Sequence, residues 1–267
     1  MPEASLRSAL RRVFRLENRR AAIRPGRLET FNDLGRQLTV YLPAGYDEHP
    51  ERRYPVLYMQ DGQNLFDPSR SYVPGNHWHL KEAADQAIGE RTASPMIIVG
   101  IDHAGPARID EYTPTPDPKH NGGGKAADYA TFLIETIKPA IDQRYRTIPE
   151  QSAVGGSSLG GLVSLYLALK HPDVFRSAAV MSPSVWWNGR VILNHVDAFE
   201  GAKPRLWLDT GGREGAEALS DTRLLRDRLL AKGWPELKYY EDRRADHSER
   251  AWAKRVRQVL EFLFPPA

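Results

Sequence analysis

The sequence contains no cysteine, and this absence removes several kinds of chemistry at once. A chain without cysteine forms no disulfide scaffold, ligates no zinc or iron–sulfur cluster through thiolates and offers no cysteine nucleophile. Any covalent catalysis by this chain must therefore use another nucleophile, such as a serine hydroxyl.

An excess of charge of one sign is also lacking. The 37 Lys and Arg residues against 34 Asp and Glu leave a net charge of only +3. This charge is too small for nucleic acid or an anionic membrane to be the main partner. No stretch approaches 18 consecutive apolar residues, and no apolar signal-peptide region follows the arginines near position 7. We therefore expect a cytoplasmic protein without a membrane span, and nothing in the sequence indicates an oligomeric state.

Apolar runs alternate with helical patterns along the 267 residues. This alternation is typical of an α/β fold, with a mostly parallel central sheet covered by helices on both faces. The expected helices are residues 159–170, residues 216–232 and a last helix that carries an apolar stripe over 252–263. Strands are expected at residues 37–42, 55–60, 96–101, 152–157, 177–181, 205–208 and 237–240.

Two segments fall outside this rhythm. Leu6, Leu10 and Phe14 recur at helical spacing among arginines, which predicts a basic amphipathic N-terminal helix in residues 1–24, followed by a single domain over 25–267.

The second segment, residues 102–124, is rich in proline and ends on three glycines. We expect it to form an irregular loop at the rim of an active site. Within it, Arg108 and Tyr112 are candidates for contact with a carboxylate or sugar of the substrate, although a surface salt bridge would explain Arg108 equally well.

One motif carries a nucleophile. Residues 154–161 read Val-Gly-Gly-Ser-Ser-Leu-Gly-Gly, and G-x-S-x-G fits in one frame only, with Ser158 between Gly156 and Gly160. The expected strand before it and helix after it are the setting of a nucleophile elbow, a sharp turn that exposes the serine Oγ. We predict that Ser158 is the nucleophile and that the N–H of Leu159 is one oxyanion donor.

A serine nucleophile needs a base and an acid, which follow it in that architecture in the chain order Ser, acid, His. His247 comes shortly after the strand expected at 237–240, at the carboxyl edge of the sheet. Two carboxylates precede it after the strand at 205–208. Glu214, beyond a glycine turn, has the reach to His247 and is the first choice, and Asp209 is the alternative acid.

The second oxyanion donor should follow the strand expected at 55–60, where the chain reads Asp61-Gly62-Gln63. Glycine allows the backbone to approach a substrate closely, so we predict the backbone N–H of Gln63 as this donor.

Several segments together resemble the esterase branch of the α/β-hydrolase superfamily, whose members include enterochelin-esterase-like, feruloyl- and acetyl-xylan-esterase-like and S-formylglutathione-hydrolase-like proteins. The resemblance extends from about Leu38 to the C-terminus. It rests on residues 41–46 (YLPAGY), 57–66 (LYMQDGQNLF), 156–161 (GSSLGG), 182–187 (SPSVWW) and 208–211 (LDTG).

The resemblance implies an α/β-hydrolase fold and cleavage of carboxylic esters with no metal or other cofactor. It also implies that Ser158, Glu214 and His247 form the catalytic triad. Aspartate is the commoner acid in such enzymes, and the glutamate here keeps Asp209 in consideration. One branch of these relatives transfers the acyl group to a sugar instead of water.

We therefore expect a serine esterase that acts on a small-molecule ester through an acyl-enzyme. The alternatives are an acyltransferase that uses a sugar or other alcohol as acceptor, and a non-catalytic binding module on a hydrolase scaffold. The substrate could be a siderophore lactone, a feruloyl or acetyl sugar, or a small aliphatic ester.

Other side chains near these motifs are weaker candidates. Asp61 is a possible substrate contact, and Trp186 and Trp187 could line an acyl pocket or simply pack in the core. His77 and His79, together with Asp61 and an aspartate at 67, could be read as a metal site. The spacing matches no catalytic metal motif, so we expect no metal.

Overall fold

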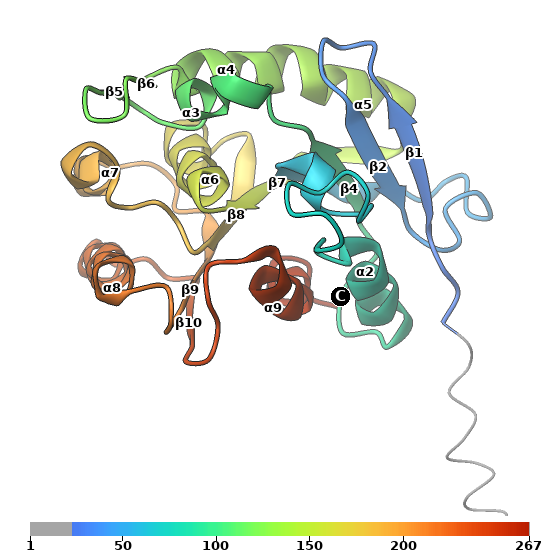
Figure 1. Ribbon diagram of the computed structural model, residues 1–267. Coiled ribbons are helices and arrows are strands. Elements are labelled where there is room, and N and C mark those ends of the chain that lie inside the picture. The colour runs from blue at the N-terminus through green and yellow to red at the C-terminus, as the bar shows by residue number, and fades with distance from the viewer. Residues whose placement is uncertain (1–22, 267) are drawn as a thin grey trace, which may run out of the picture.

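The computed structural model describes residues 23–266, and its main sheet has the strand order β1-β2-β4-β3-β7-β8-β9-β10 (Figure 1). The six strands from β4 to β10 in this order run parallel, whereas β2 runs antiparallel to both of its neighbours, β1 and β4. A mostly parallel sheet with helices on both faces confirms the expected fold class. The strands are β1 (Arg27–Phe31), β2 (Leu38–Leu42), β3 (Tyr54–Gln60), β4 (Ile97–Ile101), β7 (Thr147–Ser157), β8 (Phe175–Met181), β9 (Arg205–Gly211) and β10 (Leu237–Asp242).

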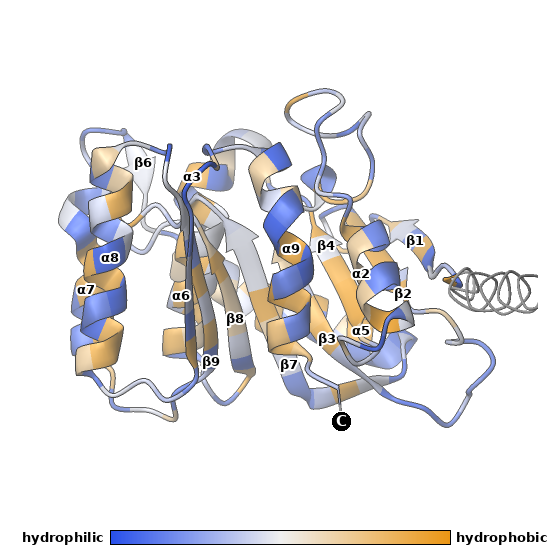
Figure 2. Cartoon of the chain, turned by 90° about the horizontal axis from the view of Figure 1, so that it is seen from below, coloured by the Kyte–Doolittle hydropathy of each residue, from blue (hydrophilic) through white to orange (hydrophobic). Residues whose placement is uncertain are grey.

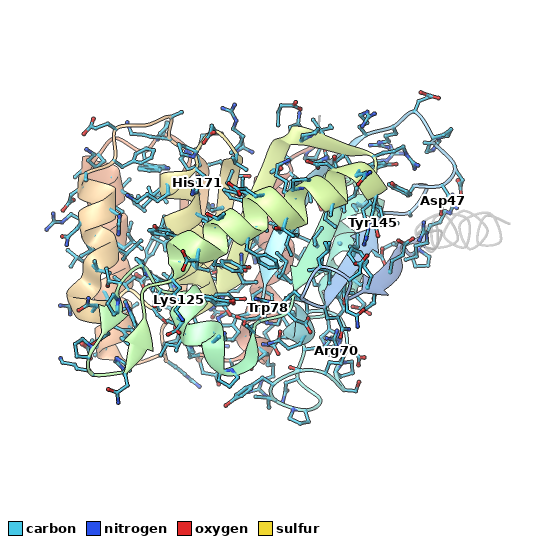
Figure 3. The ribbon with its side chains drawn as sticks, turned by 90° about the horizontal axis from the view of Figure 1, so that it is seen from above. Asp47, Arg70, Trp78, Lys125, Tyr145 and His171 are labelled. Atoms are coloured by element: carbon cyan, nitrogen blue, oxygen red, sulfur yellow. The ribbon has the colours of Figure 1, made fainter. Side chains whose placement is uncertain are left out.

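Helices cover both faces of this sheet. On one face, α2 (Leu80–Gly89) and α9 (Glu249–Leu263) lie side by side (Figures 1 and 2). A helical run crosses the other face between Lys125 and Tyr145 (Figure 3). It consists of α4 (Ala126–Phe132), η3 (Leu133–Ile137) and α5 (Lys138–Arg144), and that face also carries α6 (Leu159–Lys170), α7 (Trp187–Asp197) and α8 (Ala216–Ala231).

The two cores follow from the two-residue period of the strands. In β3, Val56 and Tyr58 point into the core beneath α6, whereas Leu57 and Met59 point into the core beneath α2 and α9. All four side chains are fully buried. The strand therefore reads as a continuous apolar run, as expected when both faces of a parallel sheet are covered.

The helix boundaries agree with the chemistry of their ends. The Ser248 hydroxyl accepts a hydrogen bond from the N–H of Ala251 at 3.3 Å, so Ser248 is the N-terminal cap of α9. Apart from its last two positions, the N-terminal helix expected in residues 1–24 lies outside the described residues. Within residues 23–266, no helix is long and apolar enough to cross a membrane.

The prediction of an irregular loop over 102–124 is wrong in part. This segment contains the short helices η2 (Gly105–Ala107) and α3 (Arg108–Glu111), and β5 (Pro116–Asp117) pairs with β6 (Gly122–Gly123). The carboxylate of Asp110 accepts hydrogen bonds from the N–H of Gly123 and from Lys125 Nζ, so long-range contacts order the segment. Such short elements produce no periodic pattern in the sequence.

Candidate active site

Ser158 occupies the turn between β7 and α6, at the carboxyl edge of the sheet. Its φ of 58° and ψ of −123° place a non-glycine residue in a sparsely populated conformation. Backbone hydrogen bonds hold this turn: the Ser158 N–H donates to Met181 O at 3.0 Å, and the Ser158 carbonyl accepts from the N–H groups of Leu162 and Ser184. Strained residues that the surrounding structure holds in place in this way are concentrated at functional sites.

The glycines of the motif make room for the turn. A Cβ on Gly156 would lie 2.8 Å from the carbonyl carbon of Gly160 and 2.9 Å from Gln60 Cβ. A Cβ on Gly160 would lie 3.1 Å from an oxygen of Asp61. The G-x-S-x-G spacing therefore lets β7, α6 and the end of β3 approach closely around Ser158.

Replacing the first of these glycines should destabilise the fold. Because the carbonyl carbon of Gly160 is backbone, it cannot move aside cheaply, and we expect Gly156→Ala to lower the free energy of unfolding by about 1–3 kcal/mol. Urea unfolding measures the loss. Gly35→Ala is the comparison variant. Its Cβ would meet nothing within 4 Å, so this variant measures the cost of an alanine at a φ of +72° without any steric clash. Equal stability of Gly156→Ala and the unsubstituted protein would contradict the account.

His247 and Glu214 are brought together from two different loops. Nδ1 of His247 lies 2.8 Å from Oε2 of Glu214. The other carboxylate oxygen of Glu214, Oε1, accepts hydrogen bonds from Ser182 Oγ at 2.6 Å and from the N–H of Gly211 at 2.7 Å. The carboxylate is thus buried and fixed in orientation, whereas 42% of the His247 side chain remains exposed.

Asp209, the alternative acid, has other partners. It is fully buried and accepts hydrogen bonds from Trp207 Nε1 at 2.7 Å and from the N–H of Ser182 at 3.1 Å. Burial raises the pKa of Asp209 to about 6, and the guanidinium of Arg255, 3.2 Å away, opposes this shift. No hydrogen bond joins Asp209 to His247 within residues 23–266, so the geometry favours Glu214 as the partner of His247.

A buried polar network behind Glu214 was missed from the sequence. The Ser182 hydroxyl donates to Glu214 and accepts from Trp252 Nε1 at 3.0 Å and from the guanidinium of Arg255 at 2.9 Å. Arg255 is 1% exposed, and its Nη2 lies 3.8 Å from the Glu214 carboxylate. The only sequence signal was an arginine three residues after Trp252, on the apolar face of the last helix.

The two predicted oxyanion donors lie at the starts of helices. Leu159 is the first residue of α6, and Gln63 lies within the 3-10 helix η1 (Gly62–Asn64). Backbone N–H groups in a first helical turn have no partner inside the helix. A Cβ on Gly62 would lie 2.6 Å from the carbonyl carbon of Gly100, so this turn packs tightly on β4.

Ser158 and His247 line one cavity of about 560 Å³. Asp61 and Arg108 also line it, and the Arg108 guanidinium donates to both oxygens of Asp61, from Nε at 2.7 Å and from Nη2 at 2.8 Å. The other lining residues are Gln63, Asn64, Tyr72, Val73, His103, Gly105, Ser157, Glu249 and Trp252.

Three suggested substrate contacts do not line this cavity. Tyr112 and Trp187 are fully buried, where Tyr112 Oη accepts from the N–H of Asp61 and Trp187 Nε1 donates to Thr115 O. Trp186 is 39% exposed and packs against the ring of His120. Core packing explains the first two, and none of the three is among the residues that line this cavity.

Comparison with known proteins finds relatives for most of the chain. The model of the family described as "Putative esterase" matches residues 32–263. The uncharacterised protein YbbA of Bacillus subtilis is 28% identical over 245 residues, which cover 86% of this chain and 92% of YbbA. Ferri-bacillibactin esterase BesA of Bacillus subtilis is 32% identical over 168 residues, which cover 56% of this chain and only 54% of BesA.

A solved structure shares the fold. The crystal structure of the BES protein from Bacillus cereus superposes with a TM-score of 0.72, covering 90% of this chain and 95% of that one at 22% identity. The similarity supports the α/β-hydrolase fold.

Proposed function

The chain belongs to the esterase family whose model spans residues 32–263 and is a carboxylic ester hydrolase, and on this premise we propose that its catalytic triad is Ser158, His247 and Glu214. One observation carries the proposal. His247 and Ser158 line the same cavity, while the opposite side of the His247 ring is held 2.8 Å from the buried Glu214 carboxylate. A nucleophile, a base and a group that orients the base are the three parts that acyl transfer requires.

In the proposed acylation step, Ser158 Oγ attacks the ester carbonyl while Nε2 of His247 takes its proton. The carbonyl oxygen becomes an oxyanion, which the backbone N–H groups of Leu159 and Gln63 stabilise. His247 then gives the proton to the leaving alcohol, and the acyl group stays on Ser158. Water, deprotonated by the same nitrogen, hydrolyses this acyl-enzyme and restores the free serine.

Glu214 supports both steps without taking a proton. By accepting from Nδ1–H it fixes the tautomer in which Nε2 is free to act as base, and its charge stabilises the imidazolium that forms. Among the described residues, Ser158 Oγ has its hydrogen-bond partner in Ser184 Oγ, 3.3 Å away, and makes no such bond to His247. Hydrogen bonds between nucleophile and base often tighten only in the substrate complex.

Pre-steady-state kinetics with p-nitrophenyl acetate test the acyl-enzyme. We expect a burst of about one p-nitrophenolate per enzyme molecule followed by slower turnover, because acylation by an activated ester outpaces deacylation. An added alcohol acceptor distinguishes hydrolysis from acyl transfer, since an acyltransferase would turn over faster and form a new ester. Hydrolysis of this ester without any serine-bound acyl group would contradict the proposed chemistry.

A panel of esters that varies the alcohol part and the acyl part separately identifies which of each the enzyme prefers. The similarity to ferri-bacillibactin esterase BesA makes siderophore esters the first class to test. A cavity of about 560 Å³ that is lined by the Arg108–Asp61 ion pair suits a substrate with polar groups beside the ester.

A further inference from the structure

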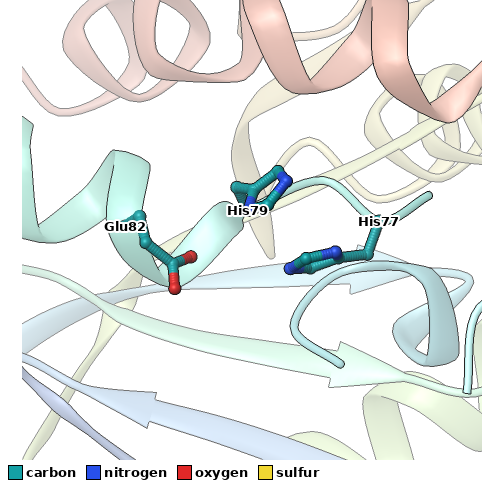
Figure 4. A group of neighbouring side chains, drawn as sticks. All are labelled: His77, His79 and Glu82. Atoms are coloured by element: carbon teal, nitrogen blue, oxygen red, sulfur yellow. The ribbon is translucent and has the colours of Figure 1, made fainter. Parts of the chain in front are cut away.

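A second cluster of chemically active side chains lies outside the catalytic cavity, at the start of α2 (Figure 4). His77, His79 and Glu82 each offer one ligand atom, and these atoms all lie within 4.8 Å of one another. The two imidazole rings are tilted by 46° to each other, with 3.8 Å between their centroids. Figure 4 shows the Glu82 carboxylate and the His77 ring turned toward each other.

The backbone builds this cluster. His79 adopts a left-handed conformation, with φ 50° and ψ 37°, at the cap position of α2, and Glu82 follows it at the i+3 position, where helical side chains become neighbours. The segment is pinned on both sides of His79, because the N–H of Trp78 donates to Asn64 O and the N–H of Leu80 donates to Leu65 O. These backbone hydrogen bonds therefore hold the ligand residues in place.

The three side chains have no competing partners. His77 is 8% exposed, yet its Nδ1 is buried without a hydrogen bond, which is unusual for a buried polar atom. The side chains of His79 and Glu82 make no hydrogen bond or ion pair with other residues in the part of the chain that the structure describes. By contrast, the neighbouring Lys81 is paired with Asp85 at 2.7 Å.

We propose that His77, His79 and Glu82 bind a first-row divalent transition metal ion of the Zn²⁺ type. Two imidazoles and one carboxylate are a ligand set that such ions favour, whereas Mg²⁺ and Ca²⁺ prefer oxygen ligands throughout. Water would complete a four-coordinate site.

The carboxylate ligand of this site differs from the two that the sequence analysis considered, Asp61 and Asp67. Asp61 is committed to Arg108, and the carboxylate of Asp67 accepts from the N–H and hydroxyl of Ser69. Glu82 takes their place as the carboxylate.

The position of the site indicates a structural role. The same segment that ends in the two histidines contains Tyr72 and Val73, which line the catalytic cavity. Asn64, another lining residue, accepts from the N–H of Tyr72 through its side chain and from Trp78 through its carbonyl. A metal ion here would anchor this rim of the cavity to α2 without touching the reacting atoms.

Isothermal titration of Zn²⁺ into the chelator-treated chain of 267 residues tests the proposal. We expect one ion per chain, together with an increase in Tm and, with Co²⁺ as the probe, the intense visible absorption of a four-coordinate ion. His79→Ala and Glu82→Gln alter exposed ligands, so both variants should fold. Each should weaken binding by more than the roughly 10–100-fold that loss of an outer-shell partner costs.

His49→Ala is the matched control, because it removes an exposed histidine outside the cluster and should leave the affinity unchanged. Carrying out the titrations also in the Ser158→Ala background keeps metal binding separate from ester hydrolysis. Failure of the unsubstituted chain to bind Zn²⁺ would overturn the proposal. So would Glu82→Gln and His79→Ala variants that bind Zn²⁺ as tightly as the unsubstituted chain does.

Discussion

Ser158→Ala should reduce kcat for ester hydrolysis on the order of 10⁶-fold, the loss found when the serine of a hydrolase triad is removed. The alanine leaves the turn and the cavity in place but removes the oxygen that forms the acyl-enzyme. Substrate binding should survive, so KM should change far less than kcat. Steady-state kinetics on p-nitrophenyl acetate measure both constants.

Ser184→Ala is the matched control, because its hydroxyl lies 3.3 Å from that of Ser158 and it is also a buried serine next to the turn. Loss of one neutral hydrogen bond is worth about 1 kcal/mol, so we expect a change of about fivefold. A Ser158→Ala variant with activity close to that of Ser184→Ala would contradict the assignment of the nucleophile.

Glu214→Gln should reduce kcat on the order of 10⁴-fold, as the equivalent acid-to-amide change does in a serine protease triad. The amide can present an N–H to Nδ1 of His247 and so stabilise the tautomer whose Nε2 carries the proton and cannot act as base. The loss should appear in kcat, with the fold intact by circular dichroism.

Asp209→Asn distinguishes the two acids. Asp209 contacts Trp207, Ser182 and Arg255 but not His247, so its loss should lower the free energy of unfolding by about 1–3 kcal/mol and change kcat much less than Glu214→Gln does. If the 10⁴-fold loss instead followed Asp209→Asn and spared Glu214→Gln, the acid of the triad would be Asp209.

Local patterns in the sequence were sufficient for the elements that position the site. The run 152–157 consists of small and apolar residues because the strand is buried on both faces, and the helix after Ser158 follows from the glycines and the apolar residues beyond them. β1 was not predicted, because Arg27–Phe31 is an edge strand with a mixed burial pattern and no long apolar run.

Contacts between distant segments could not be predicted in this way. Ser182 and Arg255 meet at Glu214 only because β8, β9 and α9 converge, and no spacing in the sequence reports that convergence. Tyr112 looked like a substrate contact because it lies in a proline-rich segment. The fold buries it beneath that segment, with its ring 5.4 Å from that of Tyr129.

Covalent labelling with a fluorophosphonate tests the central claim most directly, because the probe reports an activated serine whatever the natural ester is. We predict a single adduct per chain, mapped by peptide mass spectrometry to Ser158, absent from Ser158→Ala and formed far more slowly in His247→Ala. No adduct, or an adduct on another residue in the unsubstituted protein, would contradict the proposed triad.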